Sequence, residues 1–315
     1  MQRDTYVIRA VRALAATVVA ASAVVVSSAA EAPPAHRTFA SAEAAVRALA
    51  AAVESGDLGE VVAIFAPDGE ALVASSDPAT GQRNREVFIA AFSEGWRVVS
   101  LSANRASLVV GNEAWPFPVP LVKEGSRWRF DAAAGKEEVL ARRIGRNELA
   151  AIAICRTYVA AQLRYAQAGH DDRRAGLYAT TFRSAPGQEN GLYWTPVHGK
   201  PRSPLGDLVA QAAEEGRPLT EPSDPPMPFH GYYFKILTGQ GAAVAGGARG
   251  YVVDGELSAG FALVAWPAQY DATGIMTFVV NHDGLIRQKD LGAATDAVAR
   301  AMDVYNPDAA WHIVR

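Results

Sequence analysis

GIMTFVVNHDGLIRQK, at residues 274–289, predicts two antiparallel strands joined by a tight turn. Residues 275–280 are all apolar or β-branched, Leu285 and Ile286 begin the second run, and the Asn-His-Asp-Gly sequence at 281–284 has the composition of a turn. Similar strand-like runs occur at 231–237 and 261–266. The C-terminal half of the chain is therefore expected to contain an antiparallel meander.

A long helix is expected before these strands. Residues 136–168 place apolar side chains, among them Leu149 and Leu163, at helical spacing. Gly145 is expected to divide this helix into two pieces. The segment 169–230 is rich in Gly, Pro, Asp and Ser, and predicts turns around one short helix.

The N-terminal half has a helical pattern first and a strand pattern afterwards. Residues 41–93 show helical spacing that begins at Ser41, a good N-cap, and residues 96–130 contain four short strand-like runs. Asp131 follows the last run and is expected to cap a helix or lie in a turn. The chain therefore predicts an α+β fold: helices with an antiparallel sheet, then a long helix packed on an antiparallel meander.

Residues 1–30 have the pattern of a secretory signal peptide. Three arginines fall within the first twelve residues, no charged residue lies between 13 and 30, and Ser28 and Ala30 suit the −3 and −1 positions. An uncleaved membrane anchor is the alternative, but the apolar run is short and rich in Ala. We expect cleavage near Ala30 and a periplasmic or secreted protein with no membrane span after cleavage.

The rest of the chain has the composition of a globular protein, with two expected domains at 31–134 and 135–315. Asp and Glu number 33 against 30 Lys and Arg, and removal of the signal peptide takes away three Arg and one Asp. Such an acidic chain is unsuited to general nucleic-acid binding. The single cysteine, Cys155, cannot form an intramolecular disulfide, and its apolar helical surroundings predict a buried thiol.

Candidate chemistry is limited to isolated side chains. The histidines show neither HxxxH nor HExxH spacing, so the sequence predicts no metal site and no cofactor. His230 precedes a strand and His282 lies beside Asp283, so a histidine paired with Asp283 or Asp290 is the candidate for acid–base catalysis. Because no GxSxG or SxxK motif supplies a nucleophile, the sequence favours a protein without catalytic activity.

Four aromatic side chains are the candidates for ligand binding: Tyr193, Trp194, Tyr232 and Trp266. Aromatic rings of this kind line grooves that bind sugars or peptides, and they also fill the cores of sheets. The spacing of the four residues leaves both interpretations open.

Longer motifs resemble a known family. RRIGRNELAAI at 142–152, FHGYYFKILTGQG at 229–241 and GIMTFVVNHDGLIRQKDLG at 274–292 are similar to the DUF2950 family of exported bacterial proteins. The resemblance covers nearly all of the mature chain. It implies no activity, because the family is functionally uncharacterised.

Two weaker resemblances concern the fold. Helices followed by strands that end in GSRWRFD, at 125–131, resemble nuclear transport factor 2 and ketosteroid isomerase relatives, which implies a cone-shaped fold with either a pocket or a filled core. GYYF at 231–234 and TFVVNHDGLI at 277–286 resemble the globular part of type IV pilins and pseudopilins. Pilins carry a leader followed directly by a hydrophobic assembly helix, which is missing here, so only the fold is implied.

We expect an exported, non-catalytic binding or interaction protein whose partner is an envelope protein or a small ligand. A periplasmic hydrolase that uses a His/Asp pair is one alternative. An accessory component of a pilus or secretion system is the other.

Overall fold

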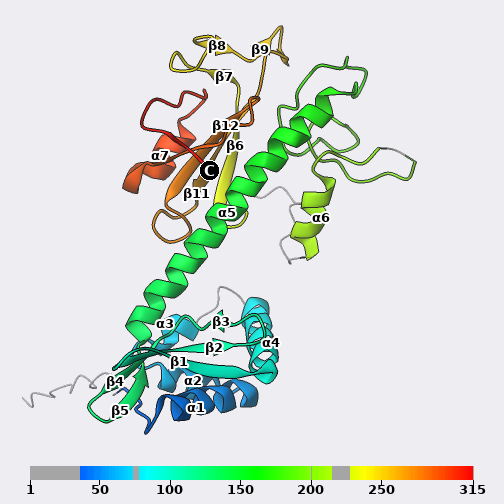
Figure 1. Ribbon diagram of the computed structural model, residues 1–315. Coiled ribbons are helices and arrows are strands. Elements are labelled where there is room, and N and C mark those ends of the chain that lie inside the picture. The colour runs from blue at the N-terminus through cyan, green and yellow to red at the C-terminus, as the bar shows by residue number, and fades with distance from the viewer. Residues whose placement is uncertain (1–35, 74–77, 200, 215–227, 315) are drawn as a thin grey trace, which may run out of the picture.

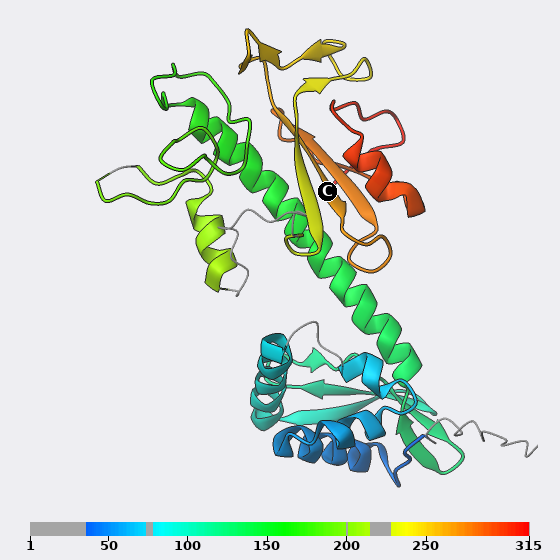
Figure 2. The same cartoon turned by 180° about the vertical axis from the view of Figure 1, so that it is seen from behind.

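The computed structural model describes residues 36–73, 78–199, 201–214 and 228–314, so the expected signal peptide lies outside the described residues. The described chain is an α+β protein with antiparallel sheets. Two lobes are connected by one long helix, α5 (Ala132–Ala166), as Figures 1 and 2 show. We call residues 36–131 the N-terminal lobe, and residues 167–314 with the second half of α5 the C-terminal lobe.

The N-terminal lobe has helices on a curved sheet. Its helices are α1 (Ala42–Ser55), α2 (Leu58–Ile64), α3 (Gly69–Val73) and α4 (Pro78–Glu94). Its strands are β1 (Trp96–Ser102), β2 (Arg105–Val110), β3 (Trp115–Pro116), β4 (Leu121–Glu124) and β5 (Arg127–Phe130). Ser41 caps α1 as expected, because its hydroxyl accepts a hydrogen bond from the Ala44 amide at 3.1 Å.

Side chains fill the space between these helices and the sheet. Leu49 of α1 and Phe65 after α2 belong to one hydrophobic cluster with Leu108, Leu121 and Phe130 of the sheet. The rings of Phe65 and Phe130 meet edge to face, with their centroids 5.2 Å apart. The interior of the N-terminal lobe is therefore a packed core.

The strands of this lobe are all antiparallel and run in the order β1-β2-β4-β5, with β3 paired to β2. β1 is therefore an edge strand that hydrogen-bonds to β2 on one side. At the other edge, Phe39 forms a bridge with Trp128 of β5. The two edges of the sheet thus differ, because Phe39 pairs alongside β5, whereas no described strand other than β2 pairs with β1.

Helix α5 is continuous, and the expected break at Gly145 is wrong. Both ends of α5 are held by tertiary contacts, which offset the cost of one glycine in a helix, about 1 kcal/mol relative to alanine. Asp131 caps the helix as predicted, with its Oδ1 accepting from the Ala134 amide at 3.4 Å. Leu149 and Leu163, expected on the buried stripe, are 69% and 46% exposed.

The C-terminal lobe contains the predicted meander. Its main strands are β6 (Tyr232–Leu237), β11 (Ala262–Pro267), β12 (Met276–Asn281), β13 (Arg287–Asp290) and β14 (His312–Ile313). They pair antiparallel in the order β14-β13-β12-β11-β6, so the meander is confirmed. Helix α5 crosses one face of this sheet, and α7 (Thr295–Arg300) covers the other (Figures 1 and 2).

The C-terminal lobe also contains several shorter helices and strands. They are α6 (Gly206–Glu214), β7 (Gly239–Gln240), β8 (Arg249–Gly250), β9 (Val252–Val253), β10 (Glu256–Leu257) and the 3-10 turn η1 (Gly292–Ala294). β7 pairs with β8, and β10 pairs with β9, as two small hairpins at the end of the lobe remote from the N-terminal lobe (Figure 1). Among the described residues, no helix combines the length and the apolar character needed to cross a membrane.

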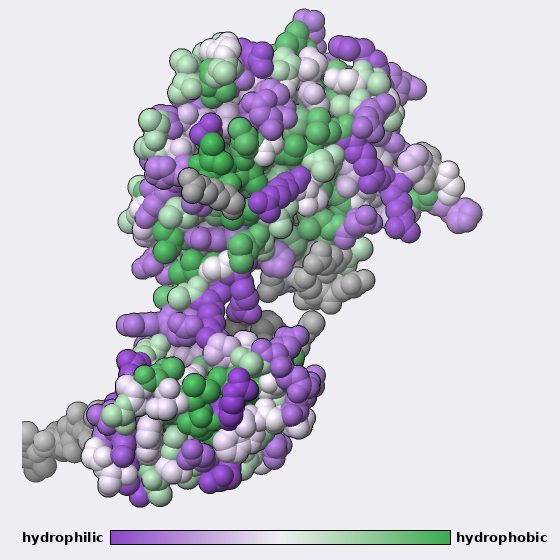
Figure 3. Space-filling view, in the orientation of Figure 1, coloured by the Kyte–Doolittle hydropathy of each residue, from purple (hydrophilic) through white to green (hydrophobic). Residues whose placement is uncertain are grey.

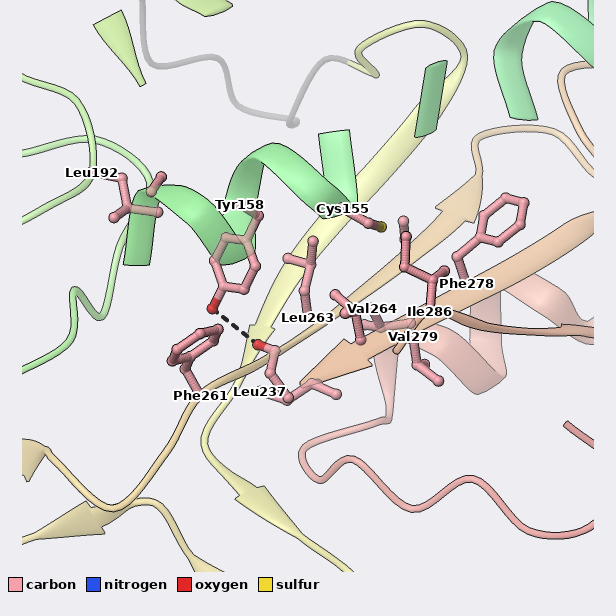
Figure 4. Packing of buried hydrophobic residues seen from close by; sticks show 14 of the residues in the cluster. Cys155, Tyr158, Leu192, Leu237, Phe261, Leu263, Val264, Phe278, Val279 and Ile286 are labelled. Atoms are coloured by element: carbon pink, nitrogen blue, oxygen red, sulfur yellow. Dashed lines mark hydrogen bonds between the residues drawn. The ribbon is translucent and has the colours of Figure 1, made fainter. Parts of the chain in front are cut away.

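Cys155 lies in the core between α5 and the sheet, as predicted (Figure 4). Leu263 and Phe278 belong to the same cluster, and the Tyr158 hydroxyl donates to the Ala262 carbonyl at 3.1 Å. Burial raises the pKa of the Cys155 thiol to about 12. The thiol is therefore protonated and unreactive in the folded protein.

Glu148 joins α5 to the C-terminal sheet. One oxygen, Oε1, accepts hydrogen bonds from the amides of Ile275 and Met276 at 2.9 and 3.0 Å, where β12 begins. The neighbouring Asn147 donates from Nδ2 to the Thr273 carbonyl at 2.8 Å. These bonds fix the rotation and the axial position of α5 on the sheet.

Replacing Glu148 with alanine is expected to lower the free energy of unfolding by about 2 kcal/mol, because two partly buried amides lose their acceptor. Urea unfolding measures the change, and faster hydrogen exchange at Ile275 and Met276 locates it. Glu137→Ala, an exposed position on the same helix, is the control. Equal effects of the two substitutions would show that Glu148 does not anchor the helix.

Cys155 is expected to resist iodoacetamide at pH 8 in the folded protein and to react fully in urea, because only the unfolded thiol ionises near pH 9. The same raised pKa makes the folded state lose stability as the pH rises from about 9 towards about 12. Mass spectrometry of the alkylated protein gives the result. Rapid labelling of the folded chain would contradict the buried position.

Candidate functional site

His230 forms part of a tight turn before β6. His230 and Gly231 have φ values of 47° and 73°, and Phe229 and Tyr232 exchange backbone hydrogen bonds of 2.8 and 3.0 Å across them. Two consecutive positive φ values define a type I′ hairpin turn. A Cβ at Gly231 would lie 2.5 Å from Asn147 Nδ2, so the turn also needs glycine for close packing against α5. The turn geometry and the close packing therefore explain the His-Gly pair at 230–231.

His282 also lies in a turn, after β12. The Gly284 amide donates to the Asn281 carbonyl at 2.9 Å, and the Asp283 amide donates to the Asn281 side chain at 3.3 Å. His282 Nε2 is 3.6 Å from Asp283 Oδ1, which brings this candidate pair together. The other ring nitrogen, Nδ1, is buried beside Tyr251 and Phe261, without a hydrogen-bond partner among the described residues.

The two histidines lie at opposite ends of the sheet. His230 precedes Tyr232, which pairs with Pro267, whereas His282 follows Asn281, which pairs with Ala262. The six-residue strands between them span roughly 17 Å. They cannot act on one substrate atom together.

Asp290, the remaining acid–base candidate, is held by hydrogen bonds. It pairs in register with Met276, at the same end of the sheet as His230 but three strands away from β6, or roughly 14 Å. Its carboxylate accepts from the Gly292 amide at 2.7 Å and from the Tyr270 hydroxyl at 3.3 Å. Asp290 therefore lies at the end of β13, where its carboxylate accepts hydrogen bonds from Gly292 and Tyr270.

The four aromatic candidates are buried. Tyr193, Trp194, Tyr232 and Trp266 are each at most 9% exposed and belong to the C-terminal core. The Tyr232 hydroxyl donates to the Met276 carbonyl at 2.9 Å, and burial raises the pKa of Tyr232. Trp266 Nε1 donates to Asp296 Oδ1 at 2.9 Å. All four side chains therefore lie in the core of the C-terminal lobe.

A cluster around a single histidine, His170, lies at the C-terminal end of α5 and was not apparent from the sequence. His170 Nδ1 is 3.1 Å from Glu189 Oε2, and its Nε2 is 3.1 Å from the Tyr165 carbonyl. The imidazole stacks on the Tyr165 ring at 4.1 Å, and the Tyr165 hydroxyl donates to the Glu189 carbonyl at 2.8 Å. Both nitrogens face acceptors, so His170 fastens the turn-rich segment to α5. No spacing motif links these residues in the sequence.

The N-terminal lobe has an open edge strand, β1. Val99 and Leu101 of this strand are 36% and 61% exposed, and Arg97 is its single charged residue. Figure 3 shows apolar surface on this lobe in the region where Figure 1 labels β1 and α2. Native edge strands are usually protected by charges, prolines or a covering element. β1 has one charge and no proline.

A hollow lies at each end of β1. The hollow at its start has a volume of about 330 Å³ and is lined by Glu94, Gly95, Trp96, Arg97, Gly111 and Asn112. The hollow at its end has a volume of about 270 Å³ and is lined by Ser41, Ala42, Glu43, Val98, Ser100, Ser102, Ala103, Ala106 and Trp128. We call β1 with these two hollows the β1 edge. The first hollow is lined by one acidic and one basic side chain, and the second by one carboxylate, several hydroxyls and an indole ring.

The described residues contain no group of three His, Cys, Asp or Glu side chains placed to hold a metal ion. A family model described as "Protein of unknown function (DUF2950)" matches residues 36–314. No curated protein and no solved structure matches the chain.

Proposed function

The chain belongs to the DUF2950 family, and we propose that it is a non-catalytic binding protein of the cell envelope that takes up an extended peptide segment along the β1 edge. The observation that carries this proposal is an edge strand of seven residues with a hollow at each end. In strand addition, main-chain hydrogen bonds supply affinity and hollows for alternate side chains supply specificity.

The residues of the β1 edge indicate which peptide segment it would bind. A strand of seven residues pairs with an extended segment of about seven residues, roughly 23 Å long. Glu94 and Arg97 at the first hollow suit a polar or charged side chain. Val98 and Trp128 at the second hollow suit an apolar one. Val99 and Leu101 would contact apolar cross-strand neighbours on the opposite face.

The proposal also includes export from the cytoplasm and a fold type for each of the two lobes. The arginine-flanked apolar run within residues 1–30 supports secretion with cleavage near Ala30. Helices followed by an antiparallel sheet support a lobe of the nuclear transport factor 2 type. A long helix packed on an antiparallel meander supports a pilin-like C-terminal lobe.

The mass and N-terminal sequence of the protein recovered from its own cells test the secretion step. A mature chain that begins at Glu31 and is found outside the cytoplasm is expected, because Ala30 occupies the −1 position. A full-length chain anchored in the inner membrane would contradict cleavage. A full-length chain in the cytoplasm would contradict export altogether.

Peptides tiled over the envelope proteins of the same cells, presented as an array, test the binding step. Bound peptides are expected to be extended and to slow hydrogen exchange in residues 96–102. Val99→Lys with Leu101→Lys is expected to weaken binding by about tenfold or more, because two cross-strand contacts are lost and two charges are placed on the edge.

Leu285→Lys is the matched control, since Leu285 is 49% exposed in the C-terminal lobe. It should leave the dissociation constant unchanged. If the control weakens binding as much as the β1 double variant, or if the protected amides lie outside the N-terminal sheet, strand addition at β1 is the wrong function.

A further inference from the structure

The open side of β1 presents the backbone groups of every second residue. The Gly111 amide donates to the Gly95 carbonyl at 2.8 Å, in the same register as the pairing of β1 with β2. Residues of an antiparallel strand alternate between those that hydrogen-bond to the partner strand and those that point away from it. Counted from Gly95, the backbones of Trp96, Val98 and Ser100 therefore point away from β2.

The neighbouring strand supports this alternation. Leu108 of β2 lies opposite Val98, and its carbonyl accepts from the Phe117 amide at 2.8 Å, on the side of β2 remote from β1. Because the backbone of Leu108 is turned away from β1, that of Val98 faces the open side. The register shifts between Ser100 and Ser102. An added segment therefore finds its regular hydrogen bonds in the part of β1 before this shift.

The side chains of β1 alternate between two faces of the sheet. Val98 and Ser100 line the hollow at the end of β1, together with the start of α1. Arg97, Val99 and Leu101 are exposed on the other face. Residues directly opposite each other in paired strands point to the same face. A peptide residue opposite Ser100 therefore points towards this hollow, and one opposite Arg97 lies beside the arginine on the other face.

The hollow at the end of β1 suits a long basic side chain. Among the described residues that line it, Glu43 alone is charged, and it forms no ion pair with another of them. The Ser100 hydroxyl donates to the Ser102 carbonyl at 3.0 Å, so its oxygen offers only lone pairs to a ligand. The apolar stem of a Lys or Arg would lie against Val98 and Trp128, with its cationic head near Glu43.

Arg97 supplies the opposite charge on the outer face. It is exposed, and no acidic side chain pairs with it in the part of the chain that the structure describes. Glu94 lines the same hollow, but its carboxylate accepts from the Asn112 amide at 2.9 Å. Arg97 is therefore open to a carboxylate of the bound segment.

We propose that the segment bound at the β1 edge runs antiparallel to β1 and carries a Lys or Arg opposite Ser100, followed three residues later by an Asp or Glu opposite Arg97. This peptide class rests on the proposed strand addition at β1. Antiparallel pairing continues the pattern of the N-terminal sheet and is slightly more stable per residue than parallel pairing. Because the two strands run in opposite directions, the residue opposite Ser100 comes first in the peptide.

Three extended peptides that differ only at these two positions test the charge order: Lys-x-x-Glu, Glu-x-x-Lys and Gln-x-x-Gln. Fluorescence anisotropy with the protein purified from its own cells is expected to show Lys-x-x-Glu binding about tenfold more tightly than Glu-x-x-Lys. The reason is that two attractions are exchanged for two repulsions. Gln-x-x-Gln should fall between them, and the preference should shrink in 1 M salt, where the Debye length is about 3 Å.

Variants of the protein assign the preference to its two charges. Glu43→Lys combined with Arg97→Glu should reverse the order of the peptides. Glu43→Lys alone should weaken Lys-x-x-Glu about threefold or more. Glu54→Lys, an equal change of charge at an exposed position of the same helix, should leave all three affinities unchanged.

Hydrogen exchange separates this peptide class from strand addition itself. Bound peptides should slow exchange most at the amides of Trp96, Val98 and Ser100, which face the open side. Equal protection and equal affinity for all three peptides would overturn the charge order and leave strand addition standing. A preference for Glu-x-x-Lys, or one that the double variant does not reverse, would have the same meaning. Absence of protection by every peptide would overturn both.

Discussion

The structure depends on a single helix that belongs to two hydrophobic cores. Ala132, in the first turn of α5, is part of the N-terminal core, and Cys155 and Tyr158 are part of the C-terminal core. Gly135 lies so close to Val119 that a Cβ would come within 2.7 Å of its side chain, which brings the start of the helix close to the N-terminal sheet. Glu148 fixes the helix on the other sheet. Because both ends are anchored, the middle of α5 stays helical although Gly145 weakens it.

Regular patterns in the sequence predicted the helices and strands. Which of their side chains are buried depends on how these elements pack together. The apolar and β-branched runs within residues 274–289 and the turn between them predicted the meander, because both signals are local. The break at Gly145 was wrong because its local preference is small against the anchoring at both ends. Leu149 and Leu163 have the apolar character of core residues, and nothing in the sequence reveals that the sheet covers the other side of the helix. Their exposure is a property of the assembled fold.

The candidate site shows the same limit. His230 and His282 were candidates for a catalytic base. In the structure each lies in a turn: His230 in the type I′ turn before β6, and His282 in the turn after β12. The His170 and Glu189 pair escaped prediction because its two residues come from distant points of a turn-rich segment. The β1 edge escaped it for another reason: β1 has one charged residue and none of the prolines that often mark an edge strand, so only the pairing order reveals its position. The exposure of Val99 and Leu101 makes this strand the functional candidate.

The length of α5 has a consequence for any partner that is itself an assembly. Thirty-five residues of uninterrupted helix form a rod of roughly 52 Å. The rod holds the open β1 edge of the N-terminal lobe, near one end, at a nearly constant distance from the C-terminal lobe at the other. Two weak attachments reinforce each other strongly only when their targets are spaced to match. A partner that contacts both lobes would then be held most tightly when its two contact points have the spacing that the rod sets, and more weakly when it presents only one of them.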